Sequence, residues 1–291
     1  MRSIFKGSMV ALVTPFKDDQ TVDHECIREL VEWQIASGTA AIVPCGTTGE
    51  SPTLSHEEHD AVIQTVVQAV NKRVPVLAGC GSNATTESLR LVRHAQDVGA
   101  DGALVITPYY NKPTQAGLIA HYETIAAGTT LPIFIYNVPG RTGVNIAPET
   151  VASLAKISNI VGIKEASGST DQASAILTSC TIDLVSGDDS MTLPLMAIGG
   201  CGVISVVANI VPRKTAALVH AVQKGDLATA EQLHYQLFNL CRMMFIDTNP
   251  IPVKAALAMM GKIREIYRLP MVPMNIENRV KLAEALKPFL S

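Results

Sequence analysis

Eight short apolar runs recur along the chain and predict eight β-strands. Each run is continuously apolar instead of alternating with polar positions, which is typical of parallel strands buried on both faces. The segments between them place apolar residues at helical spacing, and Ser55 to Glu58 matches a capping box at the start of one such helix. The predicted strands are Met9–Thr14, Ala41–Pro44, Val74–Ala78, Ala103–Thr107, Ile133–Asn137, Ile160–Lys164, Asp183–Ser186 and Val203–Val207.

Further helices are predicted around Leu89–Ala95, Leu118–Ala126, Pro148–Ala155 and Gln172–Leu177. Strand-then-helix units in this number favour a closed (β/α)8 TIM barrel over an open doubly wound sheet. The alternation ends near Lys224, and the residues beyond it keep helical spacing without a strand run. We therefore predict a barrel over residues 1–224 and a C-terminal helical extension over 225–291, packed on the barrel because no flexible linker separates them.

Composition narrows the possible partners. The chain is 47% hydrophobic and only 17% charged, where about 25% charged is usual, so we expect part of its surface to be buried between copies of itself. Lys plus Arg total 23 and Asp plus Glu total 26, and neither sign forms a long run. This balance excludes the basic surface that nucleic acid or an anionic membrane requires.

Two features bear on where the protein works. Residues 190–212 carry no charge, a length that would span a bilayer, but Gly199, Gly200 and Gly202 interrupt them and favour a buried helix, a turn and a strand. None of the six cysteines forms a C-x-x-C pair, so we expect reduced thiols in a cytoplasmic protein.

The side chain that stands out chemically is Lys164, the one lysine within a predicted strand. An ammonium inside a barrel is costly unless it is paired or loses its proton, and a free amine is the nucleophile of a Schiff-base enzyme. The alternatives are a structural ion pair with Glu165 or Asp188, or a side chain that reaches out to water.

Hydroxyl groups follow other strands, where barrel active sites lie. Tyr136, Tyr110 and Thr47 could pass protons to and from intermediates on the lysine; alternatively, tyrosines at such positions pack their rings and leave the hydroxyl in water. Arg141, in the loop after Tyr136, could bind a carboxylate or simply be solvated.

Three motifs are rejected, so we expect no metal and no cofactor. Gly79–Ala84 imitates a dinucleotide fingerprint, but Asp101 precedes the next strand instead of ending it. His56 and His59 are three residues apart and lack a third ligand. The glycines at 199–202 lack the Lys-Ser/Thr of a P-loop and predict a turn into the eighth strand.

Six segments carry a specific pattern: Gly46–Ser51, Thr107–Pro113, Tyr136–Gly143, Gly162–Ala166, Ser186–Asp189 and Asn249–Lys254. Together they resemble the dihydrodipicolinate synthase family, which belongs to the pyruvate-dependent class I aldolases. The resemblance implies a condensation of pyruvate, as a Schiff base on Lys164, with L-aspartate 4-semialdehyde in the diaminopimelate and lysine pathway. It makes Tyr136 the proton donor and acceptor and Thr47 and Tyr110 its relay, with Tyr110 entering from a neighbouring subunit.

The same resemblance implies binding roles. Thr48 and the backbone of Ile204 hold pyruvate, Arg141 meets the carboxylate of the semialdehyde, and Gly187 is a further substrate-binding residue. Relatives inhibited by lysine bind it at a dimer interface, and we expect a homotetramer built from dimers. The matching lysine-binding positions are Ser51, His56, His59, Asn83, Glu87 and Tyr109.

Three alternatives to these roles remain. His56 and His59 could simply be solvated residues in the first turn of a helix, without a role in binding lysine. A sister aldolase acting on N-acetylneuraminate or 2-keto-3-deoxygluconate would share Lys164 and Tyr136. A non-catalytic ligand-binding barrel is a further alternative, although it has no need of a buried amine.

Overall fold

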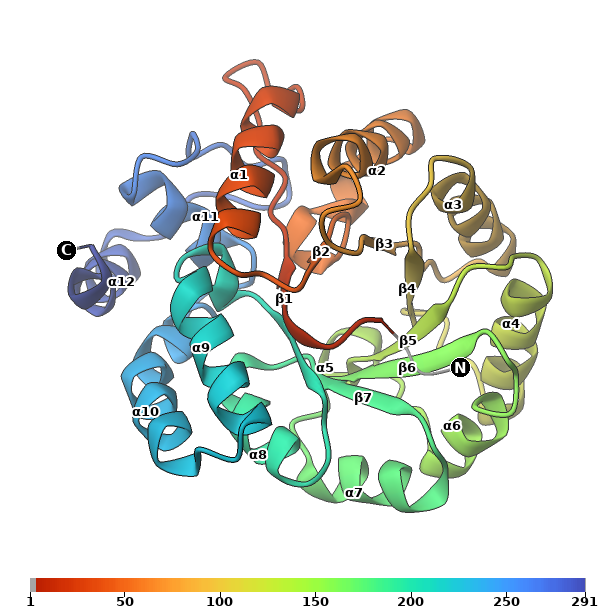
Figure 1. The fold of residues 1–291 in the computed structure, drawn as a ribbon. Coiled ribbons are helices and arrows are strands. Elements are labelled where there is room, and N and C mark those ends of the chain that lie inside the picture. Colours follow the sequence, from red (N-terminus) through yellow and green to blue (C-terminus); the bar gives the residue numbers. More distant parts are fainter. Residues whose placement is uncertain (1–3, 291) are drawn as a thin grey trace.

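Eight parallel strands form a barrel in the computed structural model, which describes residues 4–290. Figure 1 shows the strands at the centre and the helices around them. The predicted (β/α)8 TIM barrel with C-terminal helices is confirmed. The strands are β1 (Gly7–Ala11), β2 (Ala41–Val43), β3 (Leu77–Gly79), β4 (Gly102–Ile106), β5 (Ile133–Asn137), β6 (Ile160–Glu165), β7 (Asp183–Ser186) and β8 (Gly202–Ser205).

Several of the surrounding helices begin at side chains that accept their free amide groups. Ser55 and Glu58 form the predicted capping box of α2, and Thr114 and Ser169 cap α4 and α7. The helices around the barrel are α1 (His24–Ala36), α2 (His56–Val70), α3 (Thr85–Asp97), α4 (Gln115–Ala127), α5 (Pro139–Thr142), α6 (Pro148–Leu154), α7 (Thr170–Ser179), α8 (Thr192–Ala197) and α9 (Pro212–Gln223).

Strand register brings the chemistry together. Hydrogen bonding runs in the order β2-β1-β8-β7-β6-β5-β4-β3, and a bridge between Ile42 and Val76 closes the ring between β2 and β3. Across β5, β6 and β7, Tyr136, Lys164 and Val185 lie side by side. The tyrosine and the lysine therefore share one level near the carboxyl ends of their strands, where TIM barrels place their active sites.

Apolar side chains fill the inside of the barrel. They form a cluster that includes Leu104, Phe134, Tyr136 and Ile204, and Phe5 packs edge-on against Phe134 with ring centroids 5.6 Å apart. This interior is a packed core and not a pore, so a ligand reaches Lys164 from the carboxyl end.

The uncharged segment at residues 190–212 folds as the sequence predicts. It forms α8, a turn with Gly199 at a φ of 114°, and strand β8. Within residues 4–290, no helix is both long enough and apolar enough to cross a bilayer.

Three helices follow the barrel: α10 (Leu227–Met243), α11 (Ile251–Met259) and α12 (Ile276–Leu286). α10 packs on α8 and α9, while α12 packs on α10 and α11. Figure 1 shows this segment in blue outside α1 and α9. The division at residues 224 and 225 falls between α9 and α10, and the separation into two domains stays a prediction; residues 1–3 and 291 lie outside the described structure.

Candidate active site

Lys164 is the penultimate residue of β6, and only 6% of its surface is exposed. Its Nζ lies 4.1 Å from the centre of the Tyr136 ring, and within residues 4–290 it forms no ion pair. The carboxylate of Glu165 instead accepts hydrogen bonds from Asn137 and from the backbone of Ser167. The structural ion pair that the sequence left open is therefore absent from the described part of the chain.

Gly187 leaves room for the stem of that lysine. A Cβ at this position would lie 2.9 Å from Lys164 Cε and 2.7 Å from Ala166 Cβ. Contacts this short do not occur between real side chains, so any larger residue would displace the lysine. The structure places Gly187 directly against Lys164, and its role in substrate binding stays a prediction.

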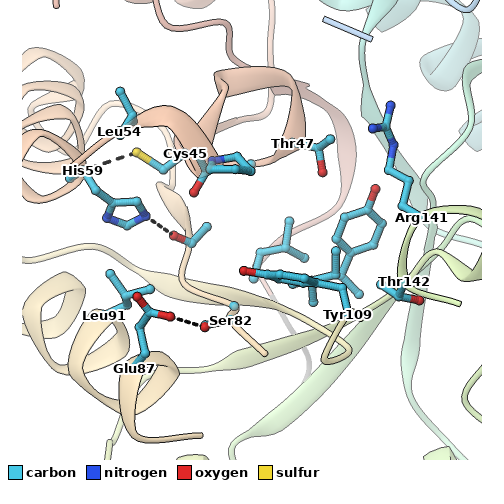
Figure 2. Close-up of a pocket in the computed structure, with 18 of the residues that line it drawn as sticks. Cys45, Thr47, Leu54, His59, Ser82, Glu87, Leu91, Tyr109, Arg141 and Thr142 are labelled. Atoms are coloured by element: carbon cyan, nitrogen blue, oxygen red, sulfur yellow. Dashed lines mark hydrogen bonds between the residues drawn. The ribbon is translucent and has the colours of Figure 1, made fainter. Parts of the chain in front are cut away.

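A cavity of about 460 Å³ opens beside Tyr136. Figure 2 shows Thr47 and Arg141 on one side of it and His59 and Glu87 on the other. The predicted residues that line it are Thr47, Ser51, His56, His59, Glu87, Tyr109, Tyr136 and Arg141. Four predicted site residues are not among its described lining residues: Lys164, Thr48, Gly187 and Ile204. Tyr136 lines the cavity and also contacts the lysine.

The loop that carries Thr47 and Thr48 is held by a buried ion pair that sequence reasoning missed. Glu50, in the left-handed conformation with a φ of 52°, bonds to the ammonium of Lys254 in α11, and both side chains are almost fully buried. Burial lowers the pKa of Lys254, while the Glu50 carboxylate opposes that shift. A single lysine within the otherwise apolar α11 was the available signal.

A second residue of the C-terminal segment contacts two predicted binding groups. The Nδ2 of Asn249 donates to Thr48 Oγ1 at 3.0 Å, and its backbone oxygen accepts from Arg141 Nη2 at 3.2 Å. Ile204 is 1% exposed and belongs to the same apolar cluster as Tyr136. In the sequence, Asn249 is recognisable only as part of the Asn249–Lys254 motif, which predicts no role for it.

Most of the predicted lysine-binding residues meet at the far side of the cavity. His56 Nε2 lies 2.7 Å from Glu87 Oε1, and Ser82 donates to the other oxygen of Glu87. The hydrogen bond from Ser82 and the neighbouring His56 hold the pKa of Glu87 below its usual range. Asn83 does not line the cavity; its backbone oxygen accepts from Asn111 Nδ2 at 2.9 Å.

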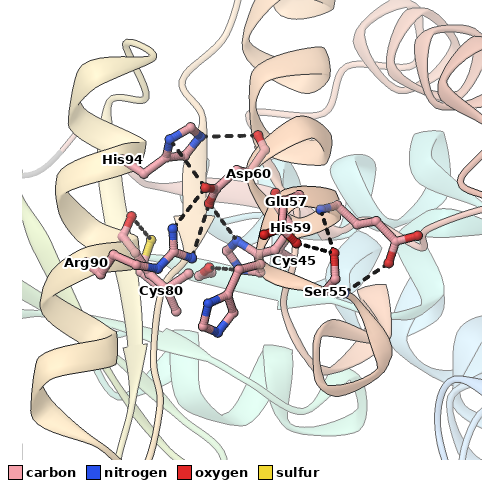
Figure 3. Close-up of polar contacts among 12 residues, drawn as sticks. Cys45, Ser55, Glu57, His59, Asp60, Cys80, Arg90 and His94 are labelled. Atoms are coloured by element: carbon pink, nitrogen blue, oxygen red, sulfur yellow. Dashed lines mark hydrogen bonds and ion pairs between the residues drawn. The ribbon is translucent and has the colours of Figure 1, made fainter.

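His59 is buried, so the solvated position allowed by the sequence is wrong for this residue. Its Nε2–H donates to the oxygen of Gly79 at 3.0 Å, and burial lowers its pKa to about 4, which keeps the ring neutral. Figure 3 shows Asp60 between His59 and Arg90. The Nη1 atom of Arg90 lies 2.9 Å from the carboxylate of Asp60.

The two glycines of the apparent dinucleotide motif have a packing explanation. A Cβ on Gly79 would lie 2.2 Å from the backbone oxygen of Cys45, and one on Gly81 would lie 2.3 Å from the nitrogen of Ile106. These positions require glycine because neighbouring backbone segments approach closely.

Tyr110 is the predicted catalytic residue that the single chain does not bring to the site. Tyr110 is 89% exposed and is not among the described residues that line the cavity. Its backbone has a φ of 72°, in the left-handed region. Tyr109, its neighbour, lines the cavity instead. The two adjacent tyrosines therefore face different surroundings.

Fold and site together are those of a TIM-barrel enzyme of the lyase and synthase class. The sequence profile of the Dihydrodipicolinate synthetase family matches residues 4–289, and the chain belongs to this family. The resemblance carried by the six motifs is thus confirmed.

Individual relatives agree over almost their whole length. The protein is 57% identical over 288 residues to the 4-hydroxy-tetrahydrodipicolinate synthase of Geobacter metallireducens, covering 98% of this chain and 99% of that one. Its fold matches the chloride-inhibited dihydrodipicolinate synthase of Acinetobacter baumannii complexed with pyruvate, with a TM-score of 0.95 and 46% identity over 97% of this chain and 98% of that one. The enzyme of Cyanidioschyzon merolae, solved with lysine bound, gives a TM-score of 0.97 and 37% identity over 100% of both chains.

Proposed function

We propose that the protein condenses pyruvate with L-aspartate 4-semialdehyde to 4-hydroxy-tetrahydrodipicolinate, on the diaminopimelate route to lysine. The observation that carries this proposal is Lys164, which is buried, has no carboxylate partner among residues 4–290 and lies against Tyr136. Relatives named for this reaction match nearly the whole chain, and one of them is complexed with pyruvate.

Lys164 supplies the nucleophile of the proposed reaction. Its amine nitrogen attacks the C2 carbonyl of pyruvate, and loss of water from the carbinolamine gives an imine. Removal of a methyl proton then gives an enamine, whose terminal carbon attacks the aldehyde carbon of the semialdehyde. The amino group of the semialdehyde finally attacks C2, which closes the ring and releases the lysine amine.

Each of these steps moves a proton, and hydroxyl groups at the site serve that need. Tyr136 touches Lys164 and lines the cavity, so its hydroxyl donates and accepts the protons, and Thr47 in the same cavity extends the relay. Tyr110 completes the relay from a second copy of the chain, since it is exposed and outside the cavity of its own.

This arrangement makes the working unit at least a dimer, and we propose a homotetramer built from dimers. The low charge content of 17% supports burial of surface between copies. We also propose a cytoplasmic location, which the six free cysteines support because oxidising compartments favour disulfides.

The two substrates are held by different groups. Thr48, Gly187 and the backbone of Ile204 hold pyruvate close to Lys164. Arg141 lies at the cavity and pairs with the carboxylate of the semialdehyde, since a guanidinium binds carboxylates through two parallel hydrogen bonds. A carboxylated aldehyde suits this arginine better than the polyol chain of a sugar acid.

The decisive assay measures turnover of pyruvate with aspartate semialdehyde. N-acetylneuraminate and 2-keto-3-deoxygluconate serve as competing substrates. We expect turnover of pyruvate with the semialdehyde and no cleavage of either sugar acid. Cleavage of either sugar acid at a higher kcat/KM would assign the protein to a sister aldolase, and no turnover of any of the three would favour the non-catalytic barrel.

We further propose that lysine binds beside Ser51, His56, His59 and Glu87 and inhibits the enzyme, with Asn83 and Tyr109 contributing at a dimer interface. A relative with 37% identity is solved with lysine bound. Glu87 is anionic because the hydrogen bond from Ser82 favours its charged form, so it pairs with an ammonium group.

Glu87→Ala is expected to weaken lysine binding by about tenfold or more, the usual effect of losing a hydrogen bond between charged groups. Isothermal titration with lysine measures the affinity, and steady-state kinetics measure the inhibition. Glu57→Ala is the matched control, because Glu57 is exposed, lies outside the cavity and bonds only to Ser55 in the described structure. Unchanged inhibition in both Glu87→Ala and His56→Ala would place the effector site elsewhere.

A further inference from the structure

Asn249 joins the C-terminal segment to the mouth of the barrel. It lies between α10 and α11 with 4% of its surface exposed. Its side chain donates to Thr48 Oγ1 and its backbone oxygen accepts from Arg141, so one buried residue contacts a group proposed to hold pyruvate and a group proposed to hold the semialdehyde.

The hydrogen bond to Thr48 determines what that hydroxyl can do. Because Thr48 Oγ1 accepts the N–H of Asn249, its own hydrogen is left for another acceptor. Within residues 4–290 no other side-chain hydrogen bond engages this hydroxyl. A carboxylate oxygen of pyruvate is an acceptor of the required kind.

The amide of Asn249 is itself incompletely satisfied. Its Oδ1 is buried and has no hydrogen-bond partner in the described part of the chain. Leaving a buried acceptor unpaired destabilises a fold, so its retention calls for an explanation. A role in positioning Thr48 explains the unpaired oxygen. The N–H of the Asn249 amide faces the Thr48 hydroxyl, so the oxygen of the same amide faces away from that hydroxyl.

The segment that follows Asn249 is bonded to the loop that carries Thr48. This contact keeps the Asn249 amide in place beside Thr48. Lys254 in α11 bonds to the buried carboxylate of Glu50, only two residues after Thr48. The backbone nitrogen of Arg268 also donates to Glu50 at 3.4 Å. The Thr48 loop and the Asn249 segment therefore contact each other at two points, Thr48 with Asn249 and Glu50 with Lys254.

We propose that Asn249 is a positioning residue for the pyruvate site: its amide orients the Thr48 hydroxyl toward the carboxylate of pyruvate, while its backbone oxygen holds Arg141 beside it. This inference rests on the proposed function and adds to it a contribution from the C-terminal segment. Asn249 acts through Thr48 and Arg141 and does not itself touch the reacting atoms.

The test follows Schiff-base formation alone, by borohydride trapping of Lys164 over a range of pyruvate concentrations. Asn249→Ala is expected to raise the half-saturating pyruvate concentration about tenfold, the usual effect of a disturbed hydrogen bond to a charged group. Asn249→Asp is expected to raise it further, because a carboxylate accepts the hydrogen of Thr48 and repels that of pyruvate.

Semialdehyde KM is expected to change less than threefold in both variants, since the backbone oxygen that contacts Arg141 remains. Asn278→Ala is the matched control: this asparagine also lies in the C-terminal segment and donates to Asp247 at 3.1 Å, away from the cavity. It should trap pyruvate like the unaltered protein.

A structural role is separated from a positioning role by the double variant Asn249→Ala with Thr48→Val. If Asn249 acts through Thr48, the double variant half-saturates like Thr48→Val alone, because the two effects share one contact. Additive effects, or an unchanged half-saturation in Asn249→Asp, would overturn the inference. Should Asn249→Ala fail to fold, Asn249→Ser provides the same comparison. Absence of trapping in the unaltered protein would instead overturn the proposed function, and this inference with it.

Discussion

Borohydride added together with pyruvate is expected to inactivate the protein irreversibly and to leave one reduced pyruvyl group, on Lys164. The reason is geometric as well as chemical. Lys164 is buried at the carboxyl end of β6 with no ion-pair partner within residues 4–290, and Gly187 leaves open the space beside its stem. An amine held in this way adds to a carbonyl more readily than one fixed by a carboxylate.

The chain provides its own control for this experiment. Lys254 is more deeply buried than Lys164, but its ammonium is paired with Glu50 and faces the ring of Phe16 at 4.3 Å. It should stay unlabelled, which shows that burial alone does not produce the reaction. Peptide mass mapping locates the adduct, and Lys164→Ala should show neither labelling nor turnover.

Labelling at any lysine other than Lys164 would contradict the mechanism. An unlabelled protein that still turns over pyruvate and the semialdehyde would show that the reaction proceeds without an imine. An unlabelled protein without turnover would support the non-catalytic barrel.

Tyr136→Phe and Thr47→Val are each expected to lower kcat by about two to four orders of magnitude, the usual loss when a general acid or base is removed. The effect on pyruvate KM should be smaller. Phenylalanine keeps the ring that lies 4.1 Å from Lys164 Nζ, so the first variant removes the hydroxyl and leaves the packing in place. Steady-state kinetics with both substrates varied separate the two parameters.

Tyr122→Phe is the matched control for the loss of a tyrosine hydroxyl. Tyr122 is fully buried and its hydroxyl donates to the backbone oxygen of Val105 at 2.9 Å. Its removal should lower stability, by about 1 kcal/mol for a typical hydrogen bond, and leave kcat nearly unchanged. If Tyr136→Phe and Thr47→Val keep rates within about threefold of the unaltered protein, neither hydroxyl relays protons.

The sequence by itself predicts the barrel because eight continuous apolar runs, typical of parallel strands buried on both faces, alternate with helical patterns. It also predicts where Lys164, Tyr136 and Thr47 lie, since a TIM barrel gathers its strand ends at one face regardless of their separation along the chain. Strand bounds were less accurate, as β1 begins at Gly7 and β3 at Leu77.

Only the tertiary structure reveals which polar side chains are buried and with what partners. His59 follows His56 by three residues in one helix, yet it is buried and neutral while His56 is largely exposed. Glu50 and Lys254 meet across about two hundred residues of chain. Local patterns carry no record of such contacts, because they depend on how separate elements pack and not on the spacing within any one of them.

The sequence therefore determines the architecture and the face on which the chemistry lies, since both follow from local periodicity and from the geometry of parallel strands. The tertiary structure decides that Lys164 has no ion-pair partner in the described chain, that Asn249 bonds to Thr48 and Arg141, and that Tyr110 is exposed outside the cavity of its own chain. These are properties of distant residues brought together, and the free energy of burying each polar group depends on the partner that folding provides.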